Sequence, residues 1–373
     1  MTVTSIAALE TPCLLLDQAK LADNIARMTQ SVTRLGVQLR PHLKTAKSAK
    51  VGVLATQDHK FGITVSTLRE AEYFADHGFK DITYAVGLAP GKLDRAAALI
   101  ARGVDLKVLA DTVDAARAIA DHGAAFKLLV EIDCGDGRAG VSATGQTLLE
   151  IADCLSGSKA ARLDGVLTHA GHSYGVNDIP KIQQIAEDER QAVVHAAERL
   201  RTAGHAVNTV SAGSTPTALF SQDATGLTEY RAGVYVFFDL DQQSRGVCQT
   251  QELALSVLAT VIGHNRESSK ILLDAGGLAL SKDIGANAFR PEVRYGAVVA
   301  VDGPALNDVY VTSVSQEHGH VKVTDPALFQ RLPVGSRVRI LPNHVCMTAA
   351  AYPVYNVTDG DTLIDQWDRC NGW

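Results

Sequence analysis

The sequence lacks the features that mark membrane, secreted and nucleic-acid-binding proteins. No apolar run in its 373 residues is long enough to cross a bilayer, and we predict no signal peptide because the first residues are neither basic nor strongly apolar. The six cysteines contain no Cys-x-x-Cys pair, which favours the reducing cytoplasm over a disulfide scaffold. The net charge of −6 argues against nucleic acid or a membrane surface as a partner.

Low-complexity tracts and solenoid repeats are also missing, and no Gly-x-Gly-x-x-Gly motif follows the first predicted strand. From about residue 12 to 240, short apolar runs alternate with Ala-rich stretches of helical spacing. This rhythm predicts an α/β fold with a (β/α)8 TIM-like barrel of parallel strands, which we favour over an open doubly wound sheet. The predicted barrel strands are 35–40, 61–66, 81–86, 106–110, 127–132, 163–168, 209–212 and 231–237.

The predicted barrel helices lie between these strands, at 67–77, 91–102, 112–122, 143–155 and 180–203. After about residue 245 the pattern changes to alternating apolar and polar residues with few helical stretches, which predicts an antiparallel β domain. Its predicted strands are 250–263, 270–274, 297–301, 309–315, 320–324 and 336–340. We therefore predict a barrel domain at residues 13–245 and a β domain formed by residues 1–12 and 246–373.

A lysine stands directly after the first predicted strand, within residues 40–47. Pro41 cannot donate a ladder hydrogen bond, so the strand should end there. A lysine held on such a turn and removed from water has a lowered pKa, and its amine becomes a nucleophile or base. The simpler alternative is a solvated basic face formed by Lys44, Lys47 and Lys50. Active groups of a barrel gather at its strand ends, which favours a catalytic Lys44.

Other predicted strand ends carry further candidates. Arg138 lies in a glycine-flanked turn after the fifth strand, and His169 and Tyr174 follow the sixth. Glycine flanks let the chain bend so that the guanidinium of Arg138 points inward. Each candidate also has a simpler structural explanation. Arg138 could be an ordinary surface arginine, His169 a histidine that only packs, and Tyr174 an aromatic residue at the rim of the barrel.

A phosphate site is predicted after the seventh strand, in residues 211–217. Glycine lets a ligand approach the backbone closely, and N–H groups and hydroxyls bind phosphate, although a Ser/Thr helix cap has the same composition. The eighth strand, which we expect to begin near Arg231, supplies further N–H groups. The predicted phosphate residues are Gly213, Ser214, Thr215, Gly233 and Tyr235.

A histidine and a cysteine follow the last predicted strand of the β domain, in residues 342–346. Alternate residues of an extended chain point the same way, so His344 and Cys346 could reach one metal ion. Imidazole and thiolate together favour Zn²⁺, and two protein ligands leave positions open for water or substrate. The alternative is a buried cysteine that acts as a small hydrophobe beside a loop histidine.

Four motifs, at 40–45, 136–140, 211–216 and 342–346, occur in an order that resembles the family of D-serine dehydratases and D-threonine aldolases. These are fold-type III pyridoxal-phosphate enzymes related to alanine racemase, and the resemblance covers essentially the whole chain. It implies that Lys44 carries the Schiff base with pyridoxal 5′-phosphate and that the five residues above hold its phosphate. It also implies that His169 and Tyr174 line the cofactor pocket.

Further roles follow from the same resemblance. It implies that Arg138 lies near the ring hydroxyl or the substrate carboxylate and that Arg231 faces the pyridine nitrogen. His344 and Cys346 would bind zinc or another divalent metal such as manganese. The family forms dimers, so we expect a homodimer. Many relatives carry a histidine where this chain has Ala46.

These parts predict a lyase that dehydrates a D-β-hydroxy amino acid, such as D-serine or D-threo-3-hydroxyaspartate, to a 2-oxo acid and ammonia. Lys44 would take the α-proton and the metal would help the β-hydroxyl to leave. An aldolase that gives glycine and an aldehyde is the alternative, but aldolase relatives tend to carry His-x-Asp where this chain has Cys346. A racemase would need a second base, a non-catalytic cofactor carrier would be a lone barrel, and a metal hydrolase would carry paired histidines on the first strand.

Overall fold

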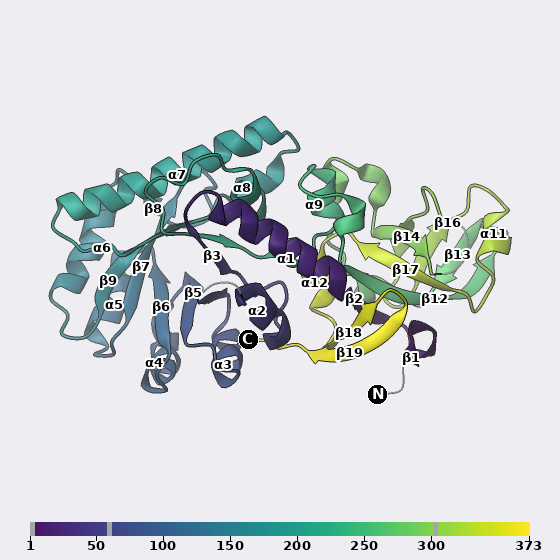
Figure 1. The fold of residues 1–373 in the computed structure, drawn as a ribbon, viewed down its shortest axis with the longest axis horizontal. Coiled ribbons are helices and arrows are strands. Elements are labelled where there is room, and N and C mark those ends of the chain that lie inside the picture. The colour runs from purple at the N-terminus through teal and green to yellow at the C-terminus, as the bar shows by residue number, and fades with distance from the viewer. Residues whose placement is uncertain (1–3, 58–61, 302–304) are drawn as a thin grey trace. The chain divides into compact units, whose positions relative to one another are not determined.

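The computed structural model describes residues 4–57, 62–301 and 305–373 (Figure 1). Contacts between Cα atoms divide these residues into two compact units. The barrel unit comprises residues 26–233 and 370–373, and the β unit comprises the described part of residues 1–25 and residues 234–369. The predicted domain boundaries after residues 12 and 245 remain a prediction. None of the described helices is both long and apolar enough to cross a membrane.

The barrel unit contains parallel strands that pair in the order β4-β5-β6-β7-β9-β10-β11-β3. The ring is completed between its two ends, because Leu43 N–H donates to Thr64 O at 2.9 Å beside a parallel bridge from His42 to Thr64. The predicted barrel is therefore confirmed, although residue 61 of the second predicted strand lies outside the described residues. The strands are β3 (Gln38–Pro41), β4 (Ile63–Val65), β5 (Asp81–Gly87), β6 (Asp105–Ala110), β7 (Lys127–Asp133), β9 (Arg162–Thr168), β10 (Thr209–Ala212) and β11 (Glu229–Ala232).

Helices lie outside the barrel strands, so the strands are buried on both faces (Figure 1). Hydroxyls mark where two of the helices begin: Thr67 accepts from Glu70 N–H, and Thr112 accepts from Ala115 N–H. The helices are α2 (Ala49–Thr56), α3 (Leu68–Asp76), α4 (Leu93–Ala101), α5 (Val113–Asp121), α6 (Thr147–Ser156), α7 (Ile179–Thr202) and α8 (Thr215–Phe220), and a short strand β8 (Val141–Ser142) pairs with β7.

The eighth strand is shorter than predicted. β11 ends at Ala232, opposite Pro41 at the end of β3, and the chain continues as a 3₁₀ helix, η4 (Val234–Val236). The pairing of β11 with β3 ends at Pro41, where β3 itself ends. Gly233 packs closely against the residue that follows, since an added Cβ would lie 2.7 Å from His42 O. The prediction that Arg231 opens a strand reaching residue 237 is therefore wrong, because Arg231 lies near the strand's end.

The β unit is built around a long strand, β12 (Leu255–Asn265), which pairs antiparallel with β2 (Cys13–Asp17), β13 (Lys270–Leu273) and β17 (Arg337–Pro342). The sheet is mixed, because β2 also pairs parallel with β18 (Val354–Asp359). The remaining strands are β1 (Thr4–Ser5), β14 (Gly296–Ala300), β15 (Val311–Val314), β16 (Gly319–Lys322) and β19 (Thr362–Asp368). Sequence analysis missed β2, β18 and β19, and also the helix α1 (Gln18–Thr33) that follows β2.

Candidate active site

Lys44 lies exposed on the turn that follows β3, and the backbone of this turn is held from two sides. Lys47 Nζ lies 2.8 Å from Glu70 Oε1, while Glu70 Oε2 accepts from Ser66 N–H at 3.0 Å. On the other side, Cys370 N–H donates to Lys47 O at 2.7 Å. The turn therefore presents the Lys44 amine from a fixed base, but the removal from water that the sequence argument also required is not seen, because Lys44 is exposed. The catalytic role of Lys44 remains a prediction.

Two half-buried imidazoles, those of His42 and His169, lie close enough to Lys44 in the barrel unit to be affected by its charge. Burial and the charge of Lys44 hold the pKa of His42 well below its ordinary value. The same two causes lower the pKa of His169 to about 3. His169 Nδ1 lies 2.9 Å from Gly213 O, and a carbonyl only accepts, so Nδ1 carries the hydrogen and Nε2 keeps its lone pair. Both rings are neutral near pH 7.

In the ligand-free protein, His169 should make the free energy of unfolding fall as the pH is lowered from 6.5. An unfolded histidine binds a proton below pH 6.5, whereas folded His169 stays neutral down to about pH 3, so the folded state is disfavoured across this window. Urea unfolding at pH 6.5 and pH 5 should show a smaller acid-induced loss of stability in His169→Asn than in the wild type, by about 1.5 kcal/mol. An equal loss in both proteins would mean that folded His169 already binds the proton.

The segments after β9 and β10 are joined to each other by their side chains. Besides the contact of His169 with Gly213, Ser173 Oγ lies 2.9 Å from Ser214 Oγ. Thr215 N–H also donates to Tyr174 Oη at 3.3 Å. Five of the predicted cofactor residues therefore lie together in the barrel unit: His169, Tyr174, Gly213, Ser214 and Thr215.

Residues 211–217 form both a tight backbone turn and a helix cap. Gly213 has φ +123°, and an added Cβ would lie 2.7 Å from Arg231 O, so only glycine fits. Ser214 and Thr217 form a reciprocal capping box at the start of α8, and Ser214 N–H donates to Thr217 Oγ1 at 2.9 Å. The helix-cap alternative is thus present, and the phosphate role of these residues remains a prediction.

Arg231 is buried at the end of β11, where its guanidinium donates to Ser211 Oγ and to Thr168 O. Ser211 in turn donates to Glu229 Oε1 at 2.6 Å. Burial lowers the pKa of Arg231, and the charges of Glu229 and Glu189 oppose this effect. Arg231 is therefore fixed in orientation by Ser211, which lies in the predicted phosphate segment, and by Thr168 at the end of β9.

Arg138 and Gly233 also belong to this part of the barrel unit. The side chain of Arg138 is 56% exposed, and its Nη2 lies 3.7 Å from Glu131 Oε1. The charge of Arg138 contributes to the low pKa of His169. Asp133 Oδ1 shapes the turn by accepting from Gly135 N–H and Gly137 N–H. Gly233 lies against the Lys44 turn. Tyr235 belongs to the β unit, where burial raises the pKa of its phenol, and its predicted phosphate contact stays a prediction.

The predicted metal pair lies at the start of a helix rather than on an extended chain. β17 ends at Pro342, His344 is the N-cap residue of α12 (Val345–Ala349), and Cys346 lies in its first turn. The geometric argument from extended chain was therefore wrong, yet the side chains of His344 and Cys346 still meet in a hydrogen bond. The described residues contain no group of three or more His, Cys, Asp or Glu side chains arranged to hold a metal ion.

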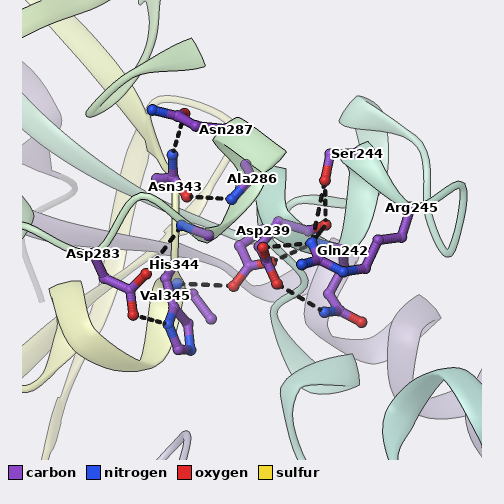
Figure 2. A network of polar contacts seen from close by, with 12 residues as sticks. Asp239, Gln242, Ser244, Arg245, Asp283, Ala286, Asn287, Asn343, His344 and Val345 are labelled. Carbon is purple, nitrogen blue, oxygen red and sulfur yellow. Dashed lines mark hydrogen bonds and ion pairs between the residues drawn. The ribbon is translucent and has the colours of Figure 1, made fainter. Parts of the chain in front are cut away.

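Two carboxylates, those of Asp283 and Asp239, lie near His344 in the β unit, as Figure 2 shows. His344 Nδ1 lies 2.7 Å from Asp283 Oδ2, and Asp239 Oδ2 accepts from Val345 N–H at 2.9 Å. Burial lowers the pKa of His344, but the hydrogen bonds with Asp283 and Cys346 and the charge of Asp239 outweigh it and raise the pKa to about 11. Surroundings that stabilise a proton on this imidazole would also stabilise a metal cation in its place.

Asn343 fixes the loop that carries the metal pair. Its Oδ1 accepts from Ala286 N–H at 3.0 Å (Figure 2). Its Nδ2 donates to Arg294 O at 2.6 Å. Asn343 is itself buried, so these contacts also satisfy its amide. The asparagine of the motif at 342–346 therefore has a structural role beside the pair.

Comparison with known proteins identifies the family. The model of the alanine racemase N-terminal domain matches residues 16–241, and a serine dehydratase domain model matches residues 254–358. The chain belongs to the family of D-serine dehydratases and D-threonine aldolases. Its fold is that of the fold-type III enzymes related to alanine racemase, and it is a lyase of this pyridoxal-phosphate-dependent class.

Two relatives match nearly the whole chain. It is 44% identical to the D-threo-3-hydroxyaspartate dehydratase of Delftia sp. (strain HT23), over 99% of both chains. It is 31% identical to a D-serine dehydratase of Dictyostelium discoideum, over 95% of both. The solved structure of the Delftia enzyme has a TM-score of 0.95 and covers 99% of this chain, and this chain covers 100% of that one. A 3-hydroxy-D-aspartate aldolase of Paracoccus denitrificans is 29% identical, over 93% of this chain and 88% of its own.

Proposed function

We propose that this enzyme is a pyridoxal-phosphate- and metal-dependent dehydratase of D-β-hydroxy amino acids. Its substrates would be D-threo-3-hydroxyaspartate or D-serine, and its products a 2-oxo acid and ammonia. The observation that carries the proposal is the pairing of Cys346 with His344 at the start of α12. The 44% identity with the Delftia dehydratase supports it.

The barrel unit offers a set of groups that suits pyridoxal phosphate. Lys44 Nζ would bind the cofactor aldehyde, and Ser214 and Thr215 would bind its phosphate with Gly233. His169 and Tyr174 would contact the ring, while the fixed Arg231 would face the pyridine nitrogen and Arg138 the substrate carboxylate. The bound cofactor supplies an electron-withdrawing ring that accepts electrons from the substrate Cα. Lys44 Nζ, once released, would take the α-proton.

The neutral imidazoles have a definite part in this arrangement. His42 and His169 both have lowered pKa values, so neither adds positive charge next to the Lys44 amine near pH 7. His169 Nε2 keeps a lone pair that can accept a hydrogen bond from the ring hydroxyl or the substrate. We therefore propose that these residues orient rather than ionise during turnover.

The β unit offers a matching site for a divalent metal. Asp283 occupies Nδ1 of His344, which leaves Nε2 for the ion, and the Cys346 thiolate would be the second ligand. The bound metal, zinc or another divalent ion such as manganese, would act as a Lewis acid on the β-hydroxyl. One solved variant of the Delftia dehydratase, with a cysteine replaced by alanine, is in the metal-free form. Another replaces a histidine two residues earlier, the spacing of His344 and Cys346.

A product assay tests the proposal against the aldolase alternative. The purified enzyme should release ammonia and a 2-oxo acid from D-threo-3-hydroxyaspartate and D-serine, with little glycine. Chelation should reduce ammonia release by at least about 100-fold, and added Zn²⁺ or Mn²⁺ should restore it. If glycine and an aldehyde are the main products, the enzyme is an aldolase.

We further propose that the protein is a cytoplasmic homodimer with the predicted division into a barrel domain and a β domain. All six cysteines are free in the structure, which supports a reducing compartment. Family resemblance supports the dimer. Sedimentation of the purified protein would measure its oligomeric state.

A further inference from the structure

A glutamate in the middle of α7 is completely buried, although it has no place in the predicted chemistry. Glu189 lies on the helix face that also buries Ile182, Ala186 and Val193. An acidic side chain in such a position must be stabilised by hydrogen bonds, because burying it unpaired is costly. Its partners therefore indicate what it does.

One oxygen of Glu189 bridges the two segments that carry the predicted cofactor residues. Glu189 Oε1 accepts from Ala170 N–H at 2.8 Å and from Gly213 N–H at 2.9 Å. Ala170 directly follows His169, and Gly213 directly precedes Ser214. Both donors are backbone groups, so the carboxylate holds the backbones of the two segments in place.

Further contacts join the same two segments, and they require the two backbones to lie at a fixed distance from each other. Gly213 donates its N–H to Glu189 and accepts at its carbonyl from His169 Nδ1, so both polar groups of this residue are already used. Ser173 and Ser214 also meet, at 2.9 Å between their hydroxyl oxygens. The Gly213 N–H is therefore a structural donor, and a phosphate must find its donors elsewhere in the segment.

We propose that Glu189 is a positioning residue for the cofactor site. It joins the segment after β9 to the segment after β10, and it thereby sets the shape of the phosphate-binding turn and the orientation of His169. This inference rests on the proposed binding of pyridoxal phosphate. The role requires a side chain as long as that of glutamate, ending in an oxygen that accepts hydrogen bonds from two N–H groups. It does not require the negative charge.

Three substitutions separate these requirements. Glu189→Gln keeps a carbonyl oxygen at the same reach and should bind pyridoxal phosphate within about threefold of the wild type. Glu189→Ala leaves both N–H groups without an acceptor, and should weaken cofactor binding at least about tenfold and shift the absorbance of the bound cofactor. Glu189→Asp keeps the charge but is one methylene shorter, and should also weaken binding, by at least about fivefold.

The measurement is reconstitution of the cofactor-free protein with pyridoxal phosphate, followed by the visible absorbance of the bound cofactor. Glu198→Ala, an exposed position on the same helix, is the matched control and should behave as the wild type. If Glu189→Ala does not fold, the Asp and Gln variants decide. The proposal would be overturned if the Ala and Asp variants both kept wild-type affinity and absorbance. If the Ala variant does not fold, wild-type affinity and absorbance in the Asp variant would be enough. A Gln variant that bound the cofactor as weakly as the Ala or Asp variant would also overturn it. A wild-type protein that binds no pyridoxal phosphate would instead refute the proposed function.

Discussion

Replacement of Lys44 by alanine is expected to abolish ammonia release, with kcat falling by at least about 10⁴-fold. The reason is that Lys44 would both hold the cofactor and take the α-proton. The neighbouring lysine cannot easily replace it, because Lys47 Nζ is bound to the buried carboxylate of Glu70. Ammonia release from D-threo-3-hydroxyaspartate would be measured with saturating pyridoxal phosphate.

A matched control and a spectroscopic measurement make this result specific. Lys50→Ala removes an exposed amine six residues further along and should leave both activity and absorbance unchanged. The wild type should show a visible band that borohydride removes, and Lys44→Ala should lack it. A Lys44→Arg enzyme that turned over D-hydroxy amino acids at the normal rate would refute the role given to this amine.

Replacement of Cys346 by alanine is expected to remove the bound metal and to lower ammonia release by at least about 100-fold. With only two protein ligands proposed, loss of one leaves His344 to hold the ion alone, and the β-hydroxyl is a poor leaving group without a Lewis acid. Cofactor absorbance should persist, because the cofactor residues of the barrel unit are unchanged. Metal content by elemental analysis and ammonia release would be measured on the same sample.

Two further variants grade this second prediction. Asp283→Asn replaces the carboxylate that lies 2.7 Å from His344 Nδ1, and should weaken metal binding about 10- to 100-fold without removing a ligand. Cys154→Ala changes a half-buried cysteine on α6 and should alter neither metal content nor activity. Full metal content and full activity in Cys346→Ala would show that the ion, if required, binds elsewhere.

The barrel was predictable because its signals are local. Strand and helix periods alternate along the chain, and hydroxyls at Thr67 and Thr112 mark helix starts, so most barrel elements agree with the structure within a few residues. The eighth strand was predicted too long because its end depends on a distant partner. β11 stops where β3 stops, and apolar residues 234–237 give no sign of this.

The positions of the site residues were predictable where a strand ends, and much less so where a contact is long-range. Lys44 and His169 follow strands directly, but no motif links Asp283 to His344, which are 61 positions apart. Glu189 did leave a signal, since it falls on the apolar face of a strongly periodic helix. An acid at such a position could have been singled out. His344 and Cys346 came together although the chain assumed to be extended is a helix start. His344, the N-cap residue, is still extended, with φ −125° and ψ 107°.

The parallel pair of β2 and β18 has a consequence for how the protein is made. Leu14 O accepts from Asn356 Nδ2 across a separation of 342 positions, so β2 emerges from the ribosome long before its neighbour in the sheet. The apolar residues Leu14–Leu16 therefore cannot pair with β18 until the entire barrel sequence has been synthesised. Translation therefore delivers the lysine turn early, while the segment with His344 and Cys346 and the strand that completes its sheet arrive near the end.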